Sequence, residues 1–376
     1  MSKRSIVFAI AFFYSLQIAS LSYLNSTLLS QHYSSRVVSV LYFVASALSL
    51  FVASRAPRLM KKIGVINTAY CALGISIVFL TSIGHVAGGY TLALAFVGYF
   101  ALISTGYSVL DVVLEHYSPP AQTGAIRGVY LTVTNSAWVI GMILNGIVLK
   151  THAIEIVYSI GSIFLCLCIL LLSRLGHVFH KKKHAEFNIR HALHTIITHV
   201  RFRRIFLCAL ILQIFFATMV IYSPLYLGQF VPLRSMTILF GIMLLPFVLF
   251  QYIGGKICDH LHYEKRFIVF GFIIMAMATI VFISLPWTTP LFLFGLVLFV
   301  SRTGAAIAEV AIESAFFRRV TDEDTAIVSI YRSIIPFSYI IVPLCALLLF
   351  SSYGIMFCIL AVVLSSTSLF IAHHQL

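Results

Sequence analysis

Long apolar runs dominate this sequence and decide what it can fold into. About twelve of them, each roughly 20–25 residues long, follow one another with short connections. Runs of this length match the thickness of a bilayer, where a helix satisfies all its backbone hydrogen bonds internally. Only 10% of the residues are charged, compared with about 25% in soluble domains. We therefore predict an all-α, multi-pass membrane protein.

The predicted spans form two sets of six that flank a basic segment. The first set comprises 5–29, 36–56, 63–84, 90–116, 125–149 and 154–175. The second set comprises 204–228, 235–258, 266–285, 289–316, 325–350 and 353–373. The chain is therefore divided into an N-terminal six-helix bundle (1–175), a cytoplasmic basic linker (176–203) and a C-terminal six-helix bundle (204–376).

The formal net charge of +14 is distributed over span ends and loops. This distribution excludes a nucleic-acid interface and matches the excess of cations on the cytoplasmic side of membrane proteins. With the N-terminus inside, the outer loops hold only Arg36, Lys150 and Arg234. Both termini are thus predicted to be cytoplasmic. The compact loops favour a prokaryotic cytoplasmic membrane.

Six histidines lie in the basic segment 176–203, and a metal site is one interpretation of them. No cluster of cysteines or carboxylates accompanies them. We therefore favour a cytoplasmic linker that carries a surface helix from about Phe187, with apolar positions resting on the lipid. The sequence predicts neither a metal nor another cofactor.

A short pattern of small and acidic residues occurs once in each half. Four matched pairs share a constant offset of 198 residues: Thr105 with Thr303, Gly106 with Gly304, Asp111 with Glu309, and Glu115 with Glu313. In a helix, the two acids of each copy lie on one face because they are four residues apart. Repetition in the same span order predicts a parallel duplication of a six-helix unit.

Asp111 and Glu309 lie inside predicted spans, where an ionisable side chain usually faces a cavity and serves function. Three roles stay open: binding of coupling protons, direct substrate contact, or pairing with Arg302, Arg332 or Arg127 in an inward-closed state. A carboxylate shielded from water favours its protonated form, and we assign this pair to proton coupling. Glu115 and Glu313 lie nearer the cytoplasmic boundary, where a structural or gating role is expected. The candidate gating charges on neighbouring spans are Arg127 and Arg332.

Arg302 lies near the middle of its predicted span, and the matching position in the first half is Ser104. An uncompensated guanidinium is costly at that depth. Arg302 therefore binds either a substrate anion or Glu309, and both interpretations stay open. The remaining candidates for substrate binding are polar residues inside the spans: Gln17, Gln213, Asn135, Trp138 and Tyr222. For Gln17 and Gln213, which lie at matched depths, interhelical hydrogen bonding is the alternative.

Two six-span halves with a long basic central loop resemble the major facilitator superfamily (MFS). The turn after the eighth span, GGKICDHLHYEKR, is similar to that family's G-x-x-x-D pattern. The matching residues are Gly255 and Asp259, followed by the basic pair Lys265 and Arg266. The resemblance implies the MFS fold, and it adds Asp259, Lys265 and Arg266 to the gating charges.

The sequence therefore predicts a secondary active transporter of the MFS type, not an enzyme. We expect it to move a small organic solute by alternating access, coupled to protons, as a monomer in contact with membrane lipids. Two alternatives stay open. One is an intramembrane enzyme with Asp111 and Glu309 as an aspartyl-type dyad, and the other is a membrane sensor or scaffold that transports nothing.

Overall fold

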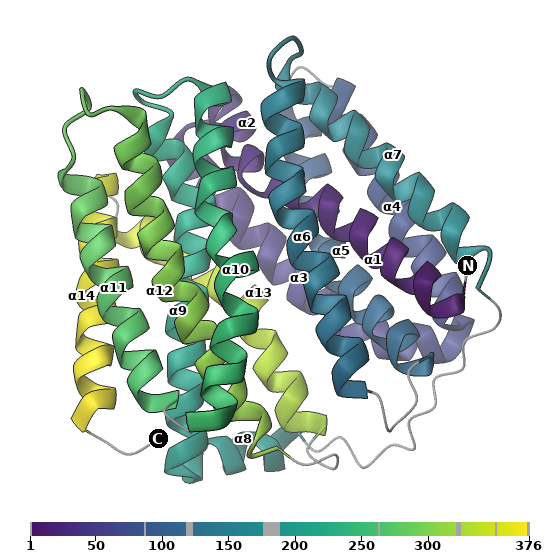
Figure 1. Cartoon of the computed structure of the whole chain (residues 1–376). Helices are drawn as coiled ribbons and strands as arrows, with labels where there is room; N and C mark the ends of the chain where they lie inside the picture. Colours follow the sequence, from purple (N-terminus) through teal and green to yellow (C-terminus); the bar gives the residue numbers. More distant parts are fainter. Residues whose placement is uncertain are drawn as a thin grey trace. The chain divides into compact units, whose positions relative to one another are not determined.

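The computed structural model describes residues 2–85, 88–117, 123–175, 189–261, 264–320, 325–349 and 352–373, in which all regular structure is helical. The helices of the first half are α1 (Lys3–Ser22), α2 (Leu24–His32), α3 (Ser35–Ile63), α4 (Val65–His85), α5 (Gly89–His116), α6 (Thr123–Val148) and α7 (Ile154–Leu172) (Figure 1). Those of the second half are α8 (Ile189–Thr198), α9 (Val200–Leu227), α10 (Leu233–Leu261), α11 (Glu264–Ser284), α12 (Leu291–Phe317), α13 (Thr325–Leu349) and α14 (Tyr353–His373).

The helices have the length and composition that membrane spans need. Within the described residues, eleven are apolar enough to cross a bilayer, and a shorter apolar stretch, Thr132–Val148, lies in α6. Large apolar side chains are exposed on outward faces, where lipid replaces water: Val78, Leu170, Phe292, Leu348 and Val362. The predicted all-α membrane protein is therefore confirmed.

The first predicted span, 5–29, is wrong in one detail because two helices replace it. The helix is interrupted at Tyr23, which separates α1 from α2. Just before the break, the Ser22 hydroxyl donates a hydrogen bond to the carbonyl oxygen of Ile18 at 2.7 Å. A serine that bonds to the carbonyl four residues earlier competes with the backbone ladder and often bends a helix.

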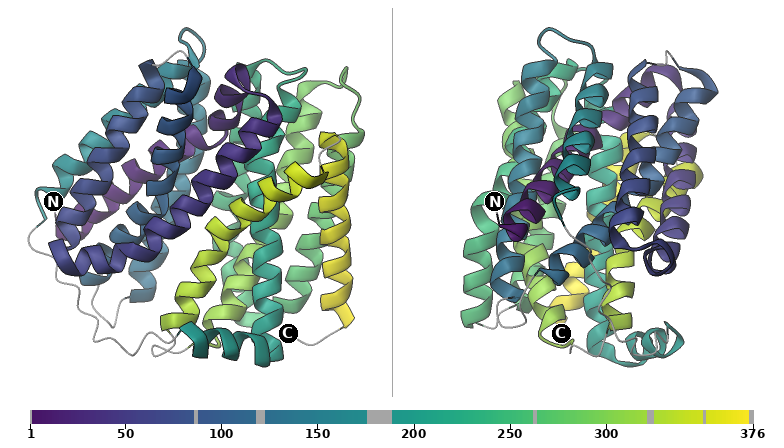
Figure 2. Two further views of the ribbon diagram at one scale, coloured as in Figure 1. Left: turned by 180° about the vertical axis from the view of Figure 1, so that it is seen from behind. Right: turned by 90° about the vertical axis from the view of Figure 1, so that its right-hand side faces the viewer.

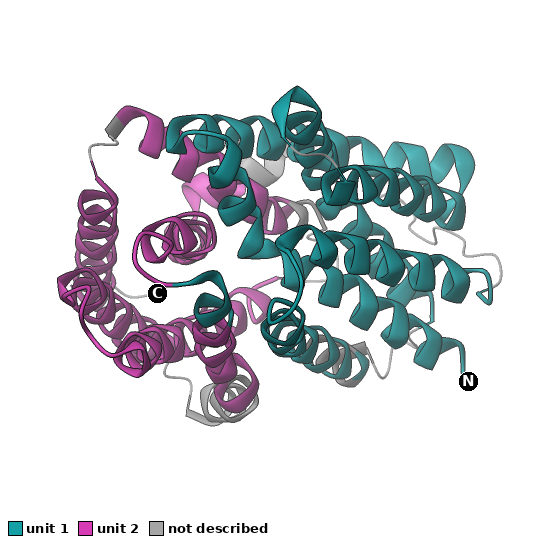
Figure 3. Ribbon diagram, turned by 90° about the horizontal axis from the view of Figure 1, so that it is seen from above, with its two compact units in different colours: residues 1–182, 232–237 teal, residues 183–231, 238–376 magenta. Residues whose placement is uncertain are grey.

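The chain forms two compact units, which Figure 3 shows in different colours. The first unit comprises residues 1–182 and 232–237, and the second comprises 183–231 and 238–376. Helix α8, which falls in the segment predicted as a linker, belongs to the second unit and packs against α9 and α13. It runs across the ends of these helices instead of along them (Figure 2).

Equivalent helices pack in the same way within each unit. In the first unit, α4 packs against α5 and α7, while α1 packs against α6 and α7. In the second unit, α11 packs against α12 and α14, while α9 packs against α13 and α14. The order of these helices along the chain is also the same, so the parallel repeat predicted from the sequence is confirmed.

Candidate functional site

The first unit gathers aromatic and polar side chains from α1, α5 and α6. Tyr14 of α1 is buried, and its hydroxyl donates to the carbonyl oxygen of Ile103 at 2.8 Å. Its ring meets that of Tyr107 edge-on, with the centroids 5.2 Å apart. Gly106 makes this approach possible, because a Cβ at that position would lie 1.9 Å from the Tyr14 hydroxyl oxygen. The small residue of the repeated pattern therefore admits an aromatic side chain to this face of α5.

Asp111 follows one turn after Tyr107 on α5 and is half-buried. Tyr107 lies within electrostatic range of Asp111 and beside Trp138 of α6. Asn135, also half-buried, precedes Trp138 by three residues on the same helix. The structure thus brings two predicted site residues, Asp111 and Trp138, together around Tyr107.

Gln17 is fully enclosed within the first unit. Its amide donates a hydrogen bond to the hydroxyl of Tyr99 on α5. A second buried bond, from the Tyr158 hydroxyl on α7 to Asn25 Oδ1, measures 2.9 Å. Gln17 therefore forms an interhelical hydrogen bond, which was the alternative to substrate binding. Its contact with a substrate stays a prediction.

Arg302 is the largest fully buried side chain in the described part of the second unit, with 1% of its surface exposed. Its guanidinium carbon, Cζ, lies 5.0 Å from the ring centroid of Phe215 and 5.3 Å from that of Phe216. Both phenylalanines lie on α9. A cation over aromatic rings is attracted by their negative faces, by about 2 kcal/mol or more when desolvated. This contact helps to offset the cost of burying Arg302.

The acidic pair of α12 faces Tyr331 of α13. Tyr331 lies within electrostatic range of Glu313 and Glu309. Its ring stacks on Phe316 of α12, with centroids 3.9 Å apart and an interplanar angle of 10°. Glu309 is half-buried, whereas Glu313 is exposed. Asp111 and Glu309, the two acids assigned to proton coupling, thus each lie close enough to a tyrosine for their charges to interact with it.

The other predicted site residues are more scattered. Gln213 of α9 is half-buried and Tyr222 is fully buried. Among the gating candidates, Glu115, Arg266 and Arg332 are exposed and Lys265 is half-buried. Gly255 and Asp259 fall within α10 and not in a turn after it. The side chains of Asp259 and Arg127 lie outside the described residues.

An ion pair that the sequence analysis missed joins the ends of α11 and α12. Arg318 Nη1 lies 3.0 Å from Glu264 Oε1. The pairing of α11 with α12 brings Glu264, at the start of α11, to the same end as Arg318, which directly follows α12. The sequence could have indicated this ion pair, because Glu264 begins one span and Arg318 ends the next, so both lie on the same side of the membrane. No group of three metal-ligating side chains occurs among the residues that the structure describes.

Comparison with known proteins adds a family and a fold. The model of the Major Facilitator Superfamily matches residues 5–343. The structure of the nucleoside transporter NupG is similar, at a TM-score of 0.79 and 12% identity, with 100% of both chains covered. A bacterial homologue of the human lysosomal transporter Spinster, inward-facing and unoccupied, has a TM-score of 0.73 and 13% identity, covering 99% of this chain and 95% of its own. At these identities the likeness shows a shared fold, and no curated protein sequence matches.

Proposed function

Because the chain belongs to the Major Facilitator Superfamily of secondary transporters, we propose that it moves a small organic solute by alternating access coupled to protons. Asp111 and Glu309 carry the protons in this proposal. The observation that supports it is the pair of half-buried carboxylates at equivalent positions of α5 and α12, with Tyr107 near the first and Tyr331 near the second. Ionisable groups inside membrane spans commonly form proton relays.

An ion gradient or the solute's own gradient supplies the energy. The sequence contains no glycine-rich phosphate loop of the kind that binds ATP. We assign the protein no enzymatic reaction, and place it as a monomer in a prokaryotic cytoplasmic membrane.

Transport by the purified protein in liposomes tests this proposal against the enzyme and sensor alternatives. The solute panel comprises amino acids, sugars, organic anions, lipophilic cations and, because NupG transports nucleosides, nucleosides. Each solute is measured with and without a pH gradient. Uptake of one class that the pH gradient drives uphill supports the proposal. Absence of uptake for every class, in liposomes shown to contain folded protein, contradicts it.

Arg302 is proposed to bind an anionic group of the solute. Two phenyl rings lie near its guanidinium carbon, and a guanidinium binds carboxylates through paired N–H donors in its own plane. Arg302→Lys keeps the charge but loses that fork, so we expect the apparent affinity to fall about tenfold. We expect Arg302→Ala to abolish binding. The measurement is equilibrium binding of the solute found in the panel, with Arg234→Lys, an exposed arginine of α10, as the control.

A double substitution separates this role from simple neutralisation of Glu309. If Arg302 only balances the charge of Glu309, Arg302→Ala combined with Glu309→Ala restores folding and binding. If it contacts the solute, the double variant folds but still does not bind. Normal binding by the double variant would rule out the substrate role.

A further inference from the structure

Helix α8 (Ile189–Thr198) lies across one end of the second unit, over the ends of α9 and α13 (Figures 1 and 2). A helix in this position lies parallel to the membrane surface if α9 and α13 cross the membrane. The sequence of this helix, IRHALHTIIT, has a period that separates apolar from polar positions on an α-helix. Such segregation is typical of helices that rest in the headgroup region.

The end of α8 presents apolar side chains to two different surroundings. Ile196 is only 7% exposed and packs inside the unit, whereas the neighbouring Ile197 is 61% exposed. Val200, at the start of α9, is also exposed. The guanidinium of Arg203 fixes this corner by donating from Nη1 to the carbonyl oxygen of Ile197 at 3.3 Å. Exposed apolar side chains are thus held next to arginines.

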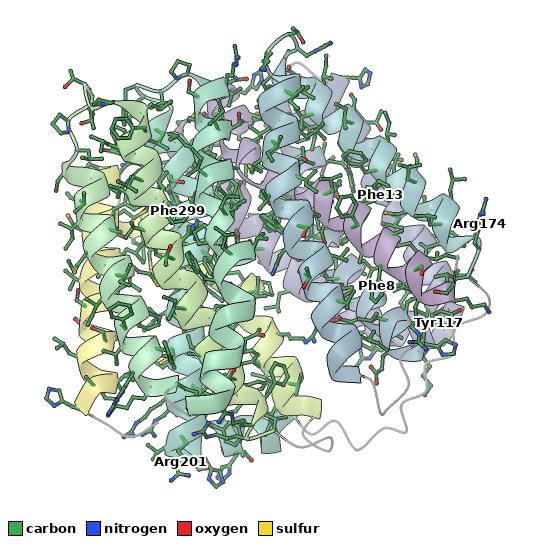
Figure 4. All side chains as sticks on the ribbon, in the orientation of Figure 1. Phe8, Phe13, Tyr117, Arg174, Arg201 and Phe299 are labelled. Atoms are coloured by element: carbon green, nitrogen blue, oxygen red, sulfur yellow. The ribbon has the colours of Figure 1, made fainter. Side chains whose placement is uncertain are left out.

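Three arginines from two parts of the second unit, the start of α9 and the end of α12, meet at this end. Arg319, which follows α12, lies in electrostatic range of Arg201 at the start of α9 and of Arg318. Glu264 forms the ion pair with Arg318 described above and also lies near Arg319. Burial, together with the two neighbouring arginines, lowers the pKa of Arg319. Its guanidinium nevertheless stays charged at any physiological pH. One acid among three arginines leaves the cluster positively charged, and Figure 4 shows Arg201 at this end of the bundle.

We propose that Ile197, Val200 and this arginine cluster form a binding surface for anionic phospholipids, with α8 as a membrane-surface anchor. The exposed apolar residues enter the acyl boundary, and Arg201, Arg318 and Arg319 contact lipid phosphates. A purely aqueous polyanion would leave Ile197 and Val200 in water, so the combination favours a lipid over a nucleic acid or an acidic protein. Each arginine near an anionic surface strengthens binding about fivefold.

Lipid retention by the purified full-length protein tests this proposal. The protein is exposed to equal amounts of phosphatidylglycerol and phosphatidylcholine, and the lipids that stay bound are identified by native mass spectrometry. We expect wild type to retain phosphatidylglycerol at least tenfold over phosphatidylcholine. We expect Arg201→Gln combined with Arg319→Gln to reduce that preference about 25-fold, since each arginine contributes about fivefold.

The control removes the same charge elsewhere: Arg36→Gln combined with Arg234→Gln, two exposed arginines at other span ends, should leave the preference unchanged. If the Arg319 change impairs folding, the exposed single changes Arg201→Gln and Ile197→Asn provide the same test. Equal retention of both lipids by wild type would overturn the proposal, as would an equal loss of preference in the control. Displacement of the lipid by excess inorganic phosphate would also overturn it, because a free anion would then be the ligand.

Discussion

Replacing Glu309 with glutamine, or Asp111 with asparagine, is expected to abolish gradient-driven accumulation of the solute while leaving solute exchange intact. Exchange needs no net proton movement, so a permanently neutral side chain can complete it. A pH difference of one unit is worth about 1.4 kcal/mol per proton, which supports about tenfold accumulation for one proton per solute. Accumulation should fall to about one in either variant. Uptake and exchange of labelled solute in liposomes measure the two properties separately.

The second acid of each repeat copy, Glu115 or Glu313, provides a matched control. Both side chains are exposed. Glu115 lies one helical turn after Asp111, and Glu313 lies one helical turn after Glu309. Glu115→Gln and Glu313→Gln should retain uphill accumulation, although either substitution can lower the amount of protein or shift the inward-closed population. Uphill transport by all four single variants would show that neither pair carries protons.

The second large effect concerns stability. We expect Gly304→Ala to destabilise the second unit because α11 and α12 approach closely there. A Cβ on Gly304 would lie 2.7 Å from the carbonyl oxygen of Gly271 and 2.9 Å from Ile274 Cβ. Backbone atoms cannot rotate aside, and overpacking of this kind costs about 1–3 kcal/mol. The thermal unfolding midpoint of the detergent-solubilised protein should fall by several degrees.

Gly74, in the middle of α4, is the control for this substitution. A Cβ at that position meets nothing within 4 Å. Since alanine is favoured over glycine inside a helix by about 0.5–1 kcal/mol, Gly74→Ala should leave the midpoint unchanged or raise it slightly. Equal midpoints for Gly304→Ala and Gly74→Ala would contradict the close packing of α11 and α12.

The spans and their duplication could be predicted because they depend on local properties of the sequence. The length and hydropathy of each run indicate a membrane helix, and a constant offset indicates a repeated unit. The break at Tyr23 could not be read in this way, because it lies within an apolar run that hydropathy alone extends to residue 29. The Ser22 hydroxyl bond to the carbonyl oxygen of Ile18 lies next to the break, and hydropathy does not reveal which of its possible hydrogen bonds a serine forms.

The contact partners of the site residues could not be predicted, because they depend on which helices pack together, and the hydrophobic periodicity of a single helix does not reveal that. The repeat made Gly106 and Gly304 equivalent, yet Gly106 admits Tyr14 of α1 whereas Gly304 meets the backbone of α11. Phe215 and Phe216 were not singled out, because two adjacent phenylalanines are ordinary in an apolar run. Only the packing of α9 against α12 brings their rings to Arg302.

Proton movement driven by the solute tests the proposed coupling most directly. Liposomes that contain the protein and a trapped pH-sensitive dye receive a solute gradient, with no initial pH gradient and with the membrane potential held at zero. We predict a change in lumen pH that depends on the solute in wild type and is absent in Asp111→Asn and Glu309→Gln. Solute flux through wild type with an unchanged lumen pH would contradict proton coupling.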